Sequence, residues 1–409
     1  MKKNKIKSPK QEFGKYGLPK EVKFCKKCVI SNQRPSSTVE FKNKNGVKKS
    51  TIGFHEDGIC DACKFAEKKL LINWDNRENE LKELLNKYRS KEGSYDVVVP
   101  GSGGKDSVKA AYLLKYKYNM HPLLVTWPPH IYTYMGRRNF DAWLNAGFDN
   151  ISYSPNQKVH RLLTKLAFVN LVHPFQPFII GQKNLAPKMS ISFNIPLVVY
   201  GENEAEYGNP INDNEKPTRD HSFYASKLRY EDIYLGGVNV KQLMVDYKLS
   251  KADIEPYLPA DPYLLEKTKT QVHYLGYYVK WDPQGCYYFA VENTDFLPND
   301  ERTEGSYSKY NSIDDKIDWF HYYTYYIKFG IGRATNDAAQ EIRNGHITRE
   351  DGVRLVKRFD GEFPEKYLKE NLEYMGLSQK QFLKIIEEAR PDHLWRKIKN
   401  SWVLKHRVS

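Results

Sequence analysis

The sequence predicts an α/β protein with a parallel central β-sheet, preceded by a small cysteine-rich region and followed by a mostly helical extension. Three observations support this prediction. Short β-branched segments alternate with longer amphipathic ones, which favours right-handed crossovers and parallel strands. One of the short segments passes through a glycine-rich loop into a helical pattern. Four of the five cysteines form two CxxC pairs ahead of these elements.

Composition and length exclude several classes of protein. The 409 residues suffice for two domains or for one large domain with additions. Hydrophobic residues make up 40% and aromatic residues 14% of the chain, which excludes disorder throughout. No run of about 20 apolar residues occurs, so no membrane span is expected. The basic N-terminal stretch lacks the apolar core of a secretory signal, which makes the cytoplasm the expected compartment.

The net charge of +14 comes from the two ends of the chain. Residues 1–50 hold 15 Lys and Arg against 3 Asp and Glu, and residues 394–409 hold 5 basic residues and no acidic one. The rest therefore carries a charge of −3. Such basic ends indicate solubility or partner docking, whereas a nucleic-acid enzyme would spread positive charge over its body, so we expect no nucleic-acid partner.

The paired cysteines predict a metal site. The pair Cys25 and Cys28 is separated by 31 residues from the pair Cys60 and Cys63, and two such knuckles can surround one tetrahedral Zn²⁺. Disulfides are disfavoured in a cytosolic chain, and a redox CxxC normally opens a helix of a thioredoxin-like unit. Four thiolates leave no open position for chemistry, so the predicted zinc is structural. We expect short strands in residues 29–59 and linking helices before residue 90.

The strongest signal is the stretch from Asp96 to Lys115. Asp96–Pro100 has the pattern of a buried strand, and a helix is predicted from Ser107 onward. The loop between them combines glycines that allow close approach to an anion, hydroxyl donors, a cation and an acid: Gly101, Ser102, Gly103, Gly104, Lys105, Asp106 and Ser107.

This loop matches neither of two familiar phosphate-binding motifs. A Walker A loop has Ser or Thr after its Lys, where this chain has Asp106, and a dinucleotide fingerprint needs a third glycine that is missing. The pattern SGGKDS instead resembles the PP-loop of the N-type ATP pyrophosphatases. The resemblance implies that residues 101–107 bind the β,γ-pyrophosphate of ATP, with Lys105 and Asp106 catalytic. It also implies cleavage between the α and β phosphates and transfer of AMP to an acceptor oxygen.

Further strands are predicted at 121–127, 151–153 and 195–200, with helices at 160–172 and 177–193. Ligands of such sheets bind beyond the carboxyl ends of the strands. By resemblance to the superfamily, Trp127 is expected near the adenine. The acids that follow the last strand, Glu202 and Glu204, are expected to contact Mg²⁺ or substrate; the alternative is that they are solvated loop acids.

Two enzyme classes remain for the acceptor, namely sulfur transfer to tRNA and nitrogen transfer to a small amide. Sulfur transfer needs a reactive cysteine or a cysteine-bound cluster, and outside the CxxC pairs only Cys286 is available. Its surroundings predict a buried residue of an aromatic strand. For nitrogen transfer, residue 2 is Lys rather than Cys and Cys286 lies in no nucleophile elbow, so ammonia is expected from a separate subunit or from solution.

The C-terminal half sharpens the choice. Its blocks 275–284, 304–316, 327–343 and 358–364, with the CxxC pairs and the glycine-rich loop, resemble the N-acetyl sugar amidotransferase family over roughly residues 24–394. That family acts in lipopolysaccharide O-antigen and nonulosonic-acid biosynthesis. The resemblance implies conversion of an acetamido group of a nucleotide-linked or free sugar to an acetamidino group, through an adenylylated imidate. It further implies glutaminase and cyclase-like partner subunits that supply the ammonia.

Three regions follow from these patterns: a basic tail with the zinc knuckle and linking helices (1–90), the ATP pyrophosphatase core (91–250), and a substrate-binding and partner-docking extension (251–409). In the extension, a helix is predicted from about residue 335, capped by Thr335 or Asn336, and two short helices follow Phe363. Substrate contacts are expected from charged and aromatic side chains, with solvated surface charge as the alternative: Lys280, Trp281, Asp282, Lys309, Lys328 and Arg333. The predicted activity is an ATP-dependent N-acetyl sugar amidotransferase, and the alternative is a tRNA thiolase with an N-terminal zinc knuckle.

Overall fold

A computed structural model describes residues 13–37, 39–43, 46–209 and 216–409. The first twelve residues of the predicted basic tail lie outside the described residues. Five strands form one all-parallel sheet in the order β3-β2-β1-β4-β7. Their bounds are β1 (Val97–Pro100), β2 (Pro122–Thr126), β3 (Asp149–Ser152), β4 (Leu197–Tyr200) and β7 (Gln271–Tyr274).

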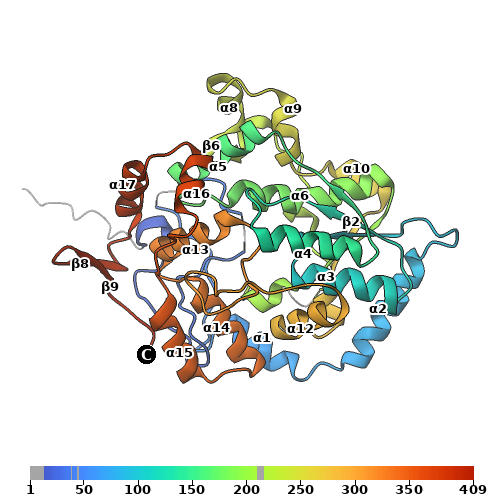
Figure 1. Cartoon of the computed structure of the whole chain (residues 1–409), viewed down its shortest axis with the longest axis horizontal. Helices are drawn as coiled ribbons and strands as arrows, with labels where there is room; N and C mark the ends of the chain where they lie inside the picture. The colour runs from blue at the N-terminus through green and yellow to red at the C-terminus, as the bar shows by residue number, and fades with distance from the viewer. Residues whose placement is uncertain (1–12, 38, 44–45, 210–215) are drawn as a thin grey trace, which may run out of the picture.

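Helices connect these strands and cover both faces of the sheet (Figure 1). Those before β4 are α1 (Asp61–Lys69), α2 (Trp74–Tyr88), α3 (Lys105–Tyr112), the π-helical η2 (Leu113–Lys117), α4 (Tyr134–Asn145), α5 (Gln157–Leu171) and α6 (Gln176–Phe193). Those between β4 and residue 300 are α8 (Val240–Asp246), α9 (Lys251–Ile254), α10 (Pro262–Thr268), α11 (Leu275–Tyr278) and α12 (Pro283–Asn293). The C-terminal ones are α13 (Lys316–Phe329), α14 (Arg333–Asn344), α15 (Arg349–Phe359), α16 (Leu368–Met375) and α17 (Gln379–Ala389).

The remaining elements are short. Two antiparallel hairpins are formed by β5 (Tyr234–Leu235) with β6 (Val238–Asn239), and by β8 (Trp395–Ile398) with β9 (Ser401–Leu404). The 3-10 turns are η1 (Lys15–Gly17), η3 (Glu204–Tyr207), η4 (His221–Phe223), η5 (Tyr230–Asp232) and η6 (Glu255–Tyr257). The hairpin β8–β9 places the basic C-terminal stretch beside the C-terminal helices (Figure 1).

The run of valines in β1 is buried on both faces of the sheet. Val98 belongs to a core formed with α5 and α6, whereas Val97 and Val99 belong to a core formed with α3, α4 and α12. A central parallel strand needs this continuous apolar pattern because helices cover both of its sides. Two further cores lie away from the sheet, one among α13, α16 and α17 and the other around the paired cysteines, α14 and α15.

Four of the five sheet strands and the helices α5 and α6 confirm the predicted elements. Strand β7 was not predicted, and it comes from residues 271–274, beyond the residue 250 at which the core was expected to end. Its pattern, Gln-Val-His-Tyr, is too short and too polar to stand out. His273 is nevertheless buried. Its polar ring can be accommodated there because both ring nitrogens form hydrogen bonds, one with the Tyr278 hydroxyl and one with the Gln271 side chain.

Three local predictions were wrong. Cys286 lies in helix α12 rather than in a strand, because Asp282 caps that helix by accepting from the backbone N–H of Gln284, and Pro283 occupies its first position. Helix α14 begins at Arg333 with Gly332 as its N-cap, while the Thr335 hydroxyl donates to Asp360 instead of capping. Residues 29–59 contain isolated bridges, such as that between Pro35 and Thr51, and no regular strand among the described residues.

Candidate functional site

The glycine-rich loop lies at the point of the sheet where the strand order reverses. The chain moves outward from β1 through β2 to β3, then returns to place β4 on the other side of β1. Loops at the carboxyl ends of two such neighbouring strands diverge and leave a crevice, the usual ligand site of open α/β sheets. Residues 101–104 leave β1 there and residues 201–203 leave β4, so these two loops frame the crevice.

The glycines of these loops differ in the space around them. A Cβ on Gly103 would lie 2.7 Å from the Phe140 Cα, and its φ of +86° is one that side chains rarely adopt. A Cβ on Gly201 would lie 2.6 Å from the carbonyl oxygen of Asp106. Gly104 has an ordinary backbone conformation with φ of −71°, and the nearest atom to its Cβ would be the Ser102 Oγ at 3.9 Å. The fold therefore requires the first two glycines, and it leaves open space at Gly104.

Helix α3 starts directly at the loop, with Gly104 as its N-cap. Gly104 has no side chain to cap the helix, so the first backbone N–H groups of α3 are available to a ligand. The positive end of the helix dipole adds to their attraction for an anion. Together with the space at Gly104, this loop has the features of a phosphate cradle.

A charged cluster surrounds the first turn of α3. The Lys105 Nζ and the Asp106 Oδ2 are 2.8 Å apart, and each side chain is 12% exposed. The indole Nε1 of Trp281 donates to the other Asp106 oxygen at 2.8 Å. From the β4 loop, Glu202 accepts a hydrogen bond from the Tyr207 hydroxyl at 2.5 Å. The predicted residues Lys105, Asp106, Glu202 and Trp281 therefore form one site although they come from three parts of the chain.

The two carboxyls of this cluster have opposite pKa shifts. Burial and then the like charge of Asp106 raise the pKa of Glu202 to about 7. Burial opposes ionisation of Asp106, but the neighbouring Lys105 ammonium and the Trp281 hydrogen bond lower its pKa. The cluster thus holds one firmly ionised acid and one acid that titrates near neutrality, a division that suits proton transfer or metal binding.

The cluster faces a cavity of about 1620 Å³. This volume exceeds that of most single small-molecule sites, which leaves room for two substrates. Several predicted residues line it: Gly101, Ser102, Gly104, Lys105, Asp106, Ser107, Glu202, Glu204, Trp281, Lys328 and Arg333. Within this set, Lys328 pairs with Glu40, Arg333 with Asp337, and Glu204 with Arg219.

The other predicted contacts lie off the cavity wall. Trp127 is 3% exposed and stacks on Tyr153 within the core. Lys280 and Lys309 are exposed, and Lys309 donates to the carbonyl of Asp300. Asp282 caps helix α12 and pairs with His346.

The structure adds a residue that sequence reasoning did not single out. The Ser102 hydroxyl donates to Asp314 at 2.8 Å, across 212 positions of the chain. Asp315 next to it accepts from the backbone N–H of His130 at 2.7 Å, which holds this segment against the loop that follows β2. The paired acids stand in one of the C-terminal blocks, yet nothing in the sequence shows which of them reaches the glycine-rich loop.

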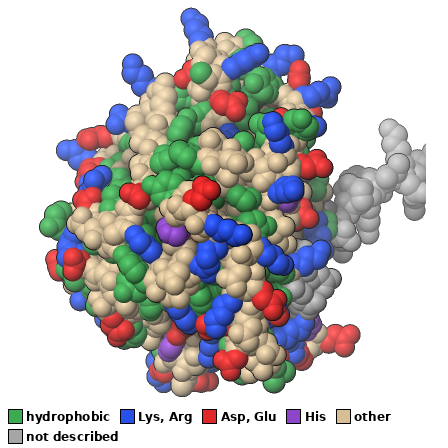
Figure 2. Space-filling view, turned by 90° about the vertical axis from the view of Figure 1, so that its right-hand side faces the viewer, with side chains coloured by type: hydrophobic (Ala, Val, Ile, Leu, Met, Phe, Trp, Pro, Cys, Tyr) green, Lys and Arg blue, Asp and Glu red, His purple; other side chains and the backbone are tan. Residues whose placement is uncertain are grey.

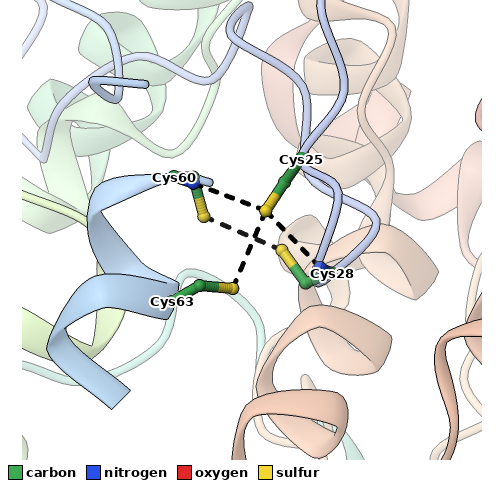
Figure 3. A group of neighbouring side chains, drawn as sticks. All are labelled: Cys25, Cys28, Cys60 and Cys63. Atoms are coloured by element: carbon green, nitrogen blue, oxygen red, sulfur yellow. Dashed lines mark hydrogen bonds between the residues drawn. The ribbon is translucent and has the colours of Figure 1, made fainter. Parts of the chain in front are cut away.

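The four paired cysteines form a second site, and their sulfurs point toward one another (Figure 3). Cys60 and Cys63 stand at the start of α1, and Cys25 and Cys28 on a loop. All four are buried, and their ligand atoms lie within 4.8 Å of one another. Two sulfur pairs are 3.8 Å apart, Cys25 with Cys63 and Cys28 with Cys60. Zinc–sulfur bonds of about 2.3 Å give a tetrahedral edge of about 3.8 Å, so the residues fit a zinc ion.

Metal analysis should find one zinc per chain, and Cys25→Ser should remove it. The Cys25 sulfur accepts backbone N–H groups of Lys27 and Cys60, both at 3.4 Å, so its loss also loosens both knuckles. We expect a markedly lower melting temperature for this variant, since structural zinc binding is coupled to folding. Cys286→Ser is the matched control and should keep its zinc. An iron–sulfur chromophore, or full metal content in Cys25→Ser, would contradict the assignment.

Comparison with known proteins places the C-terminal part of the chain. Residues 304–409 match the family model described as LPS biosynthesis protein WbpG-like, C-terminal domain. This quarter of the chain is thus similar to a lipopolysaccharide-biosynthesis domain, which fits the biosynthetic context that the sequence resemblance implies. Over 77 residues, the chain is also 35% identical to the uncharacterized protein MJ1599 of Methanocaldococcus jannaschii. That stretch covers 19% of this chain and about a quarter (27%) of the relative.

Acidic and basic side chains are interspersed on the face seen in Figure 2. Within the described part of the chain, none of the helices combines the length and the apolar character needed to cross a membrane.

Proposed function

We propose that the protein is an ATP-dependent amidotransferase of lipopolysaccharide biosynthesis, which converts the acetamido group of a sugar to an acetamidino group and releases AMP and pyrophosphate. An amide oxygen leaves poorly, so AMP is first transferred to it. Ammonia then attacks the amide carbon, and AMP departs with the oxygen. The reaction requires that the cavity hold both substrates and exclude water, which would otherwise consume the activated intermediate.

One observation carries this proposal. The domain that matches a lipopolysaccharide-biosynthesis family begins at residue 304, and its Asp314 accepts a hydrogen bond from Ser102 of the glycine-rich loop. A loop with the features of a phosphate cradle and a domain linked to sugar chemistry thus share one cavity wall. That arrangement suits an enzyme that activates a sugar with ATP.

The roles follow from the positions on the wall. We assign the phosphates of ATP to residues 101–107, with Lys105 neutralising their charge and Asp106 holding Lys105 in place. Glu202 is assigned to Mg²⁺ or to a proton of the acceptor. Mg²⁺ usually takes one or two protein carboxylates and completes its shell with phosphates and water, so Glu202 and the phosphates of ATP would together suffice to bind it. No role is assigned to the predicted contacts that lie off the wall: Trp127, Lys280, Asp282 and Lys309.

We assign the supply of ammonia to a separate glutaminase. All five cysteines are buried, and four of them belong to the cluster. Cys286 is 1% exposed, and burial followed by the nearby Asp106 charge raises the pKa of its thiol. It is therefore a poor nucleophile for glutamine hydrolysis, and equally for the sulfur transfer of a tRNA thiolase. Free ammonium should replace the partner in vitro.

The proposal is tested by incubation with ATP, Mg²⁺, ammonium and a panel of acetamido sugars. AMP and pyrophosphate should form only with the correct sugar, and the product should be lighter by the difference between an oxygen atom and an NH group. AMP release with tRNA and with none of the sugars would contradict the proposal and favour the thiolase.

The pH dependence should report on Glu202. Its carboxyl is protonated below a pKa of about 7 and ionised above it. If the carboxylate is the working form, kcat/KM should rise with pH through about 7 and then level off. The raised pKa has the opposite effect on stability, because the folded state holds the proton of Glu202 more tightly than the unfolded state. The contribution of Glu202 to the free energy of unfolding therefore decreases as the pH rises from 4.5 to about 7. Glu202→Gln should remove the inflection in activity.

Asp318 provides the control for this profile. It also lines the cavity, and burial raises its pKa to about 7. Asp318→Asn should keep the inflection if Glu202 causes it. An inflection that persists in Glu202→Gln and disappears in Asp318→Asn would reassign the role.

A further inference from the structure

Arg34 reaches the cavity from the cysteine-rich region. It is half-buried and lines the cavity wall. Its backbone N–H donates to the carbonyl of Ser31 at 3.2 Å, and its carbonyl accepts from the N–H of Ile52 at 2.9 Å. Ile52 in turn packs in the same core as the four cysteines. The cysteine cluster therefore helps to set the position of Arg34 on the wall.

The guanidinium of Arg34 lacks a partner within the described part of the chain. Its Nη1 is shielded from solvent and has no hydrogen-bond acceptor. Arginine remains charged at any ordinary pH, and a shielded charge without a counter-charge is costly. Such a cost is expected where a ligand supplies the missing anion.

The other buried or half-buried cations described on this wall all have partners. Lys49 and Lys328 pair with Glu40, Lys105 with Asp106, Lys183 with the carbonyl of Ser37, Arg219 with Glu204, and Arg333 with Asp337. Arg219 and Arg333 also have a buried Nε without an acceptor, but each is paired with a carboxylate. Arg34 differs from this set because, among the described residues, its guanidinium has neither an ion pair nor a hydrogen bond.

The groups that act most strongly on the pKa of Arg34 include no carboxylate among the described residues. Burial, opposed by the phenol of Tyr325 and assisted by the like charge of Arg343, lowers its pKa. The phenols of Tyr207 and Tyr322 also interact with it electrostatically. Tyr207 is hydrogen-bonded to Glu202, and the Tyr322 hydroxyl accepts from Arg333 at 2.7 Å. Arg34 therefore belongs to the neighbourhood of the charged cluster.

We infer that Arg34 binds an oxyanion of the acceptor substrate, a phosphate or a carboxylate. The inference rests on the proposed function, which supplies the acceptor. The glycine-rich loop already offers backbone amides and Lys105 to the phosphates of ATP, whereas Arg34 belongs to a different segment of the chain. The planar guanidinium matches both kinds of oxyanion with paired hydrogen bonds, which a lysine cannot reproduce. The acceptor is accordingly a charged acetamido sugar.

Calorimetric titration tests this in the presence of a non-hydrolysable ATP analogue and Mg²⁺. Three probes are compared: UDP-N-acetylglucosamine with its diphosphate, N-acetylneuraminic acid with its carboxylate, and uncharged N-acetylglucosamine. The wild type should bind at least one charged probe about tenfold more tightly than the neutral one. Arg34→Gln should lose this preference, and Arg34→Lys should keep part of it. Whichever charged probe is affected identifies the oxyanion.

Three controls make the result decisive. Arg354→Gln removes an exposed arginine of α15 and should bind like the wild type. Zinc content and circular dichroism must match the wild type in every variant. The ATP analogue, titrated alone, should bind Arg34→Gln within about twofold of the wild type.

Any of three outcomes would overturn the inference: equal wild-type affinity for charged and neutral probes, unchanged binding by Arg34→Gln, or a loss confined to the ATP analogue. The last outcome would assign Arg34 to the nucleotide. Since these titrations need no turnover, a failure to form AMP would count against the proposed function and leave the result on Arg34 standing.

Discussion

Replacing Gly104 with alanine should abolish ATP-dependent turnover while leaving the fold intact. The added methyl group has room in the structure, because the nearest atom is 3.9 Å away and the backbone conformation is open to any residue. Two effects on the free energy of unfolding oppose each other. Alanine is a poorer N-cap than glycine, which destabilises the fold, but it also restricts the unfolded chain, which stabilises the fold, and each effect is worth about 1 kcal/mol or less. The methyl group would, however, occupy the space that we assign to the phosphates.

Gly103→Ala is the matched control one residue away. Its Cβ would meet backbone atoms of Phe140, and its φ of +86° would strain any side chain. We expect a loss of at least about 2 kcal/mol in the free energy of unfolding. Thermal melts and titration with the ATP analogue separate the two effects: Gly104→Ala should melt normally and bind poorly. Normal binding by Gly104→Ala would contradict the placement of ATP at this loop.

Replacing Asp106 with asparagine should reduce kcat by at least about a hundredfold, the scale on which an active site loses rate when one preorganised polar group is removed. Asparagine keeps the shape of the side chain and can still accept from the Trp281 indole. It cannot pair with the Lys105 ammonium, now 2.8 Å away. Lys105 would then lose the anchor that holds it beside the loop.

The same variant should shift the pH profile. The Asp106 charge helps to raise the pKa of Glu202, so its removal should move the inflection of kcat/KM to a pH below about 7. Asp141→Asn, which breaks an exposed ion pair on α4, is the control and should change neither quantity. A slow variant with an unmoved inflection would show that the two carboxyls are not coupled, and unchanged kcat would exclude Asp106 from the mechanism.

Much of the sheet could be predicted because its central strands are buried on both faces. Three consecutive valines in a short segment that ends in a glycine-rich loop predict a buried strand, which is β1. The cysteine cluster could also be predicted, because two CxxC pairs are the spacing typical of a metal site. These signals are local, and local patterns survive without knowledge of distant contacts.

The rest of the site depends on contacts between distant segments. Asp314 and Arg34 look like ordinary polar residues in the sequence, and only the fold brings them to the cavity. Trp127 lies just after strand β2, as the sequence predicts, and its ring is buried and stacks on Tyr153. Its expected place near the adenine stays a prediction. Cys286 misled because aromatic neighbours suggest a strand, whereas the preceding Asp–Pro pair starts a helix.

The most direct test of the account follows the amide oxygen. An acetamido sugar carrying a heavy isotope of oxygen in its acetamido group is incubated with the enzyme, ATP, Mg²⁺ and ammonium, and the AMP is analysed by mass spectrometry. Transfer of AMP to the amide oxygen predicts that the label leaves in the phosphate of AMP, in step with formation of the acetamidino sugar. Unlabelled AMP, or label found only in water or in recovered sugar, would contradict the account.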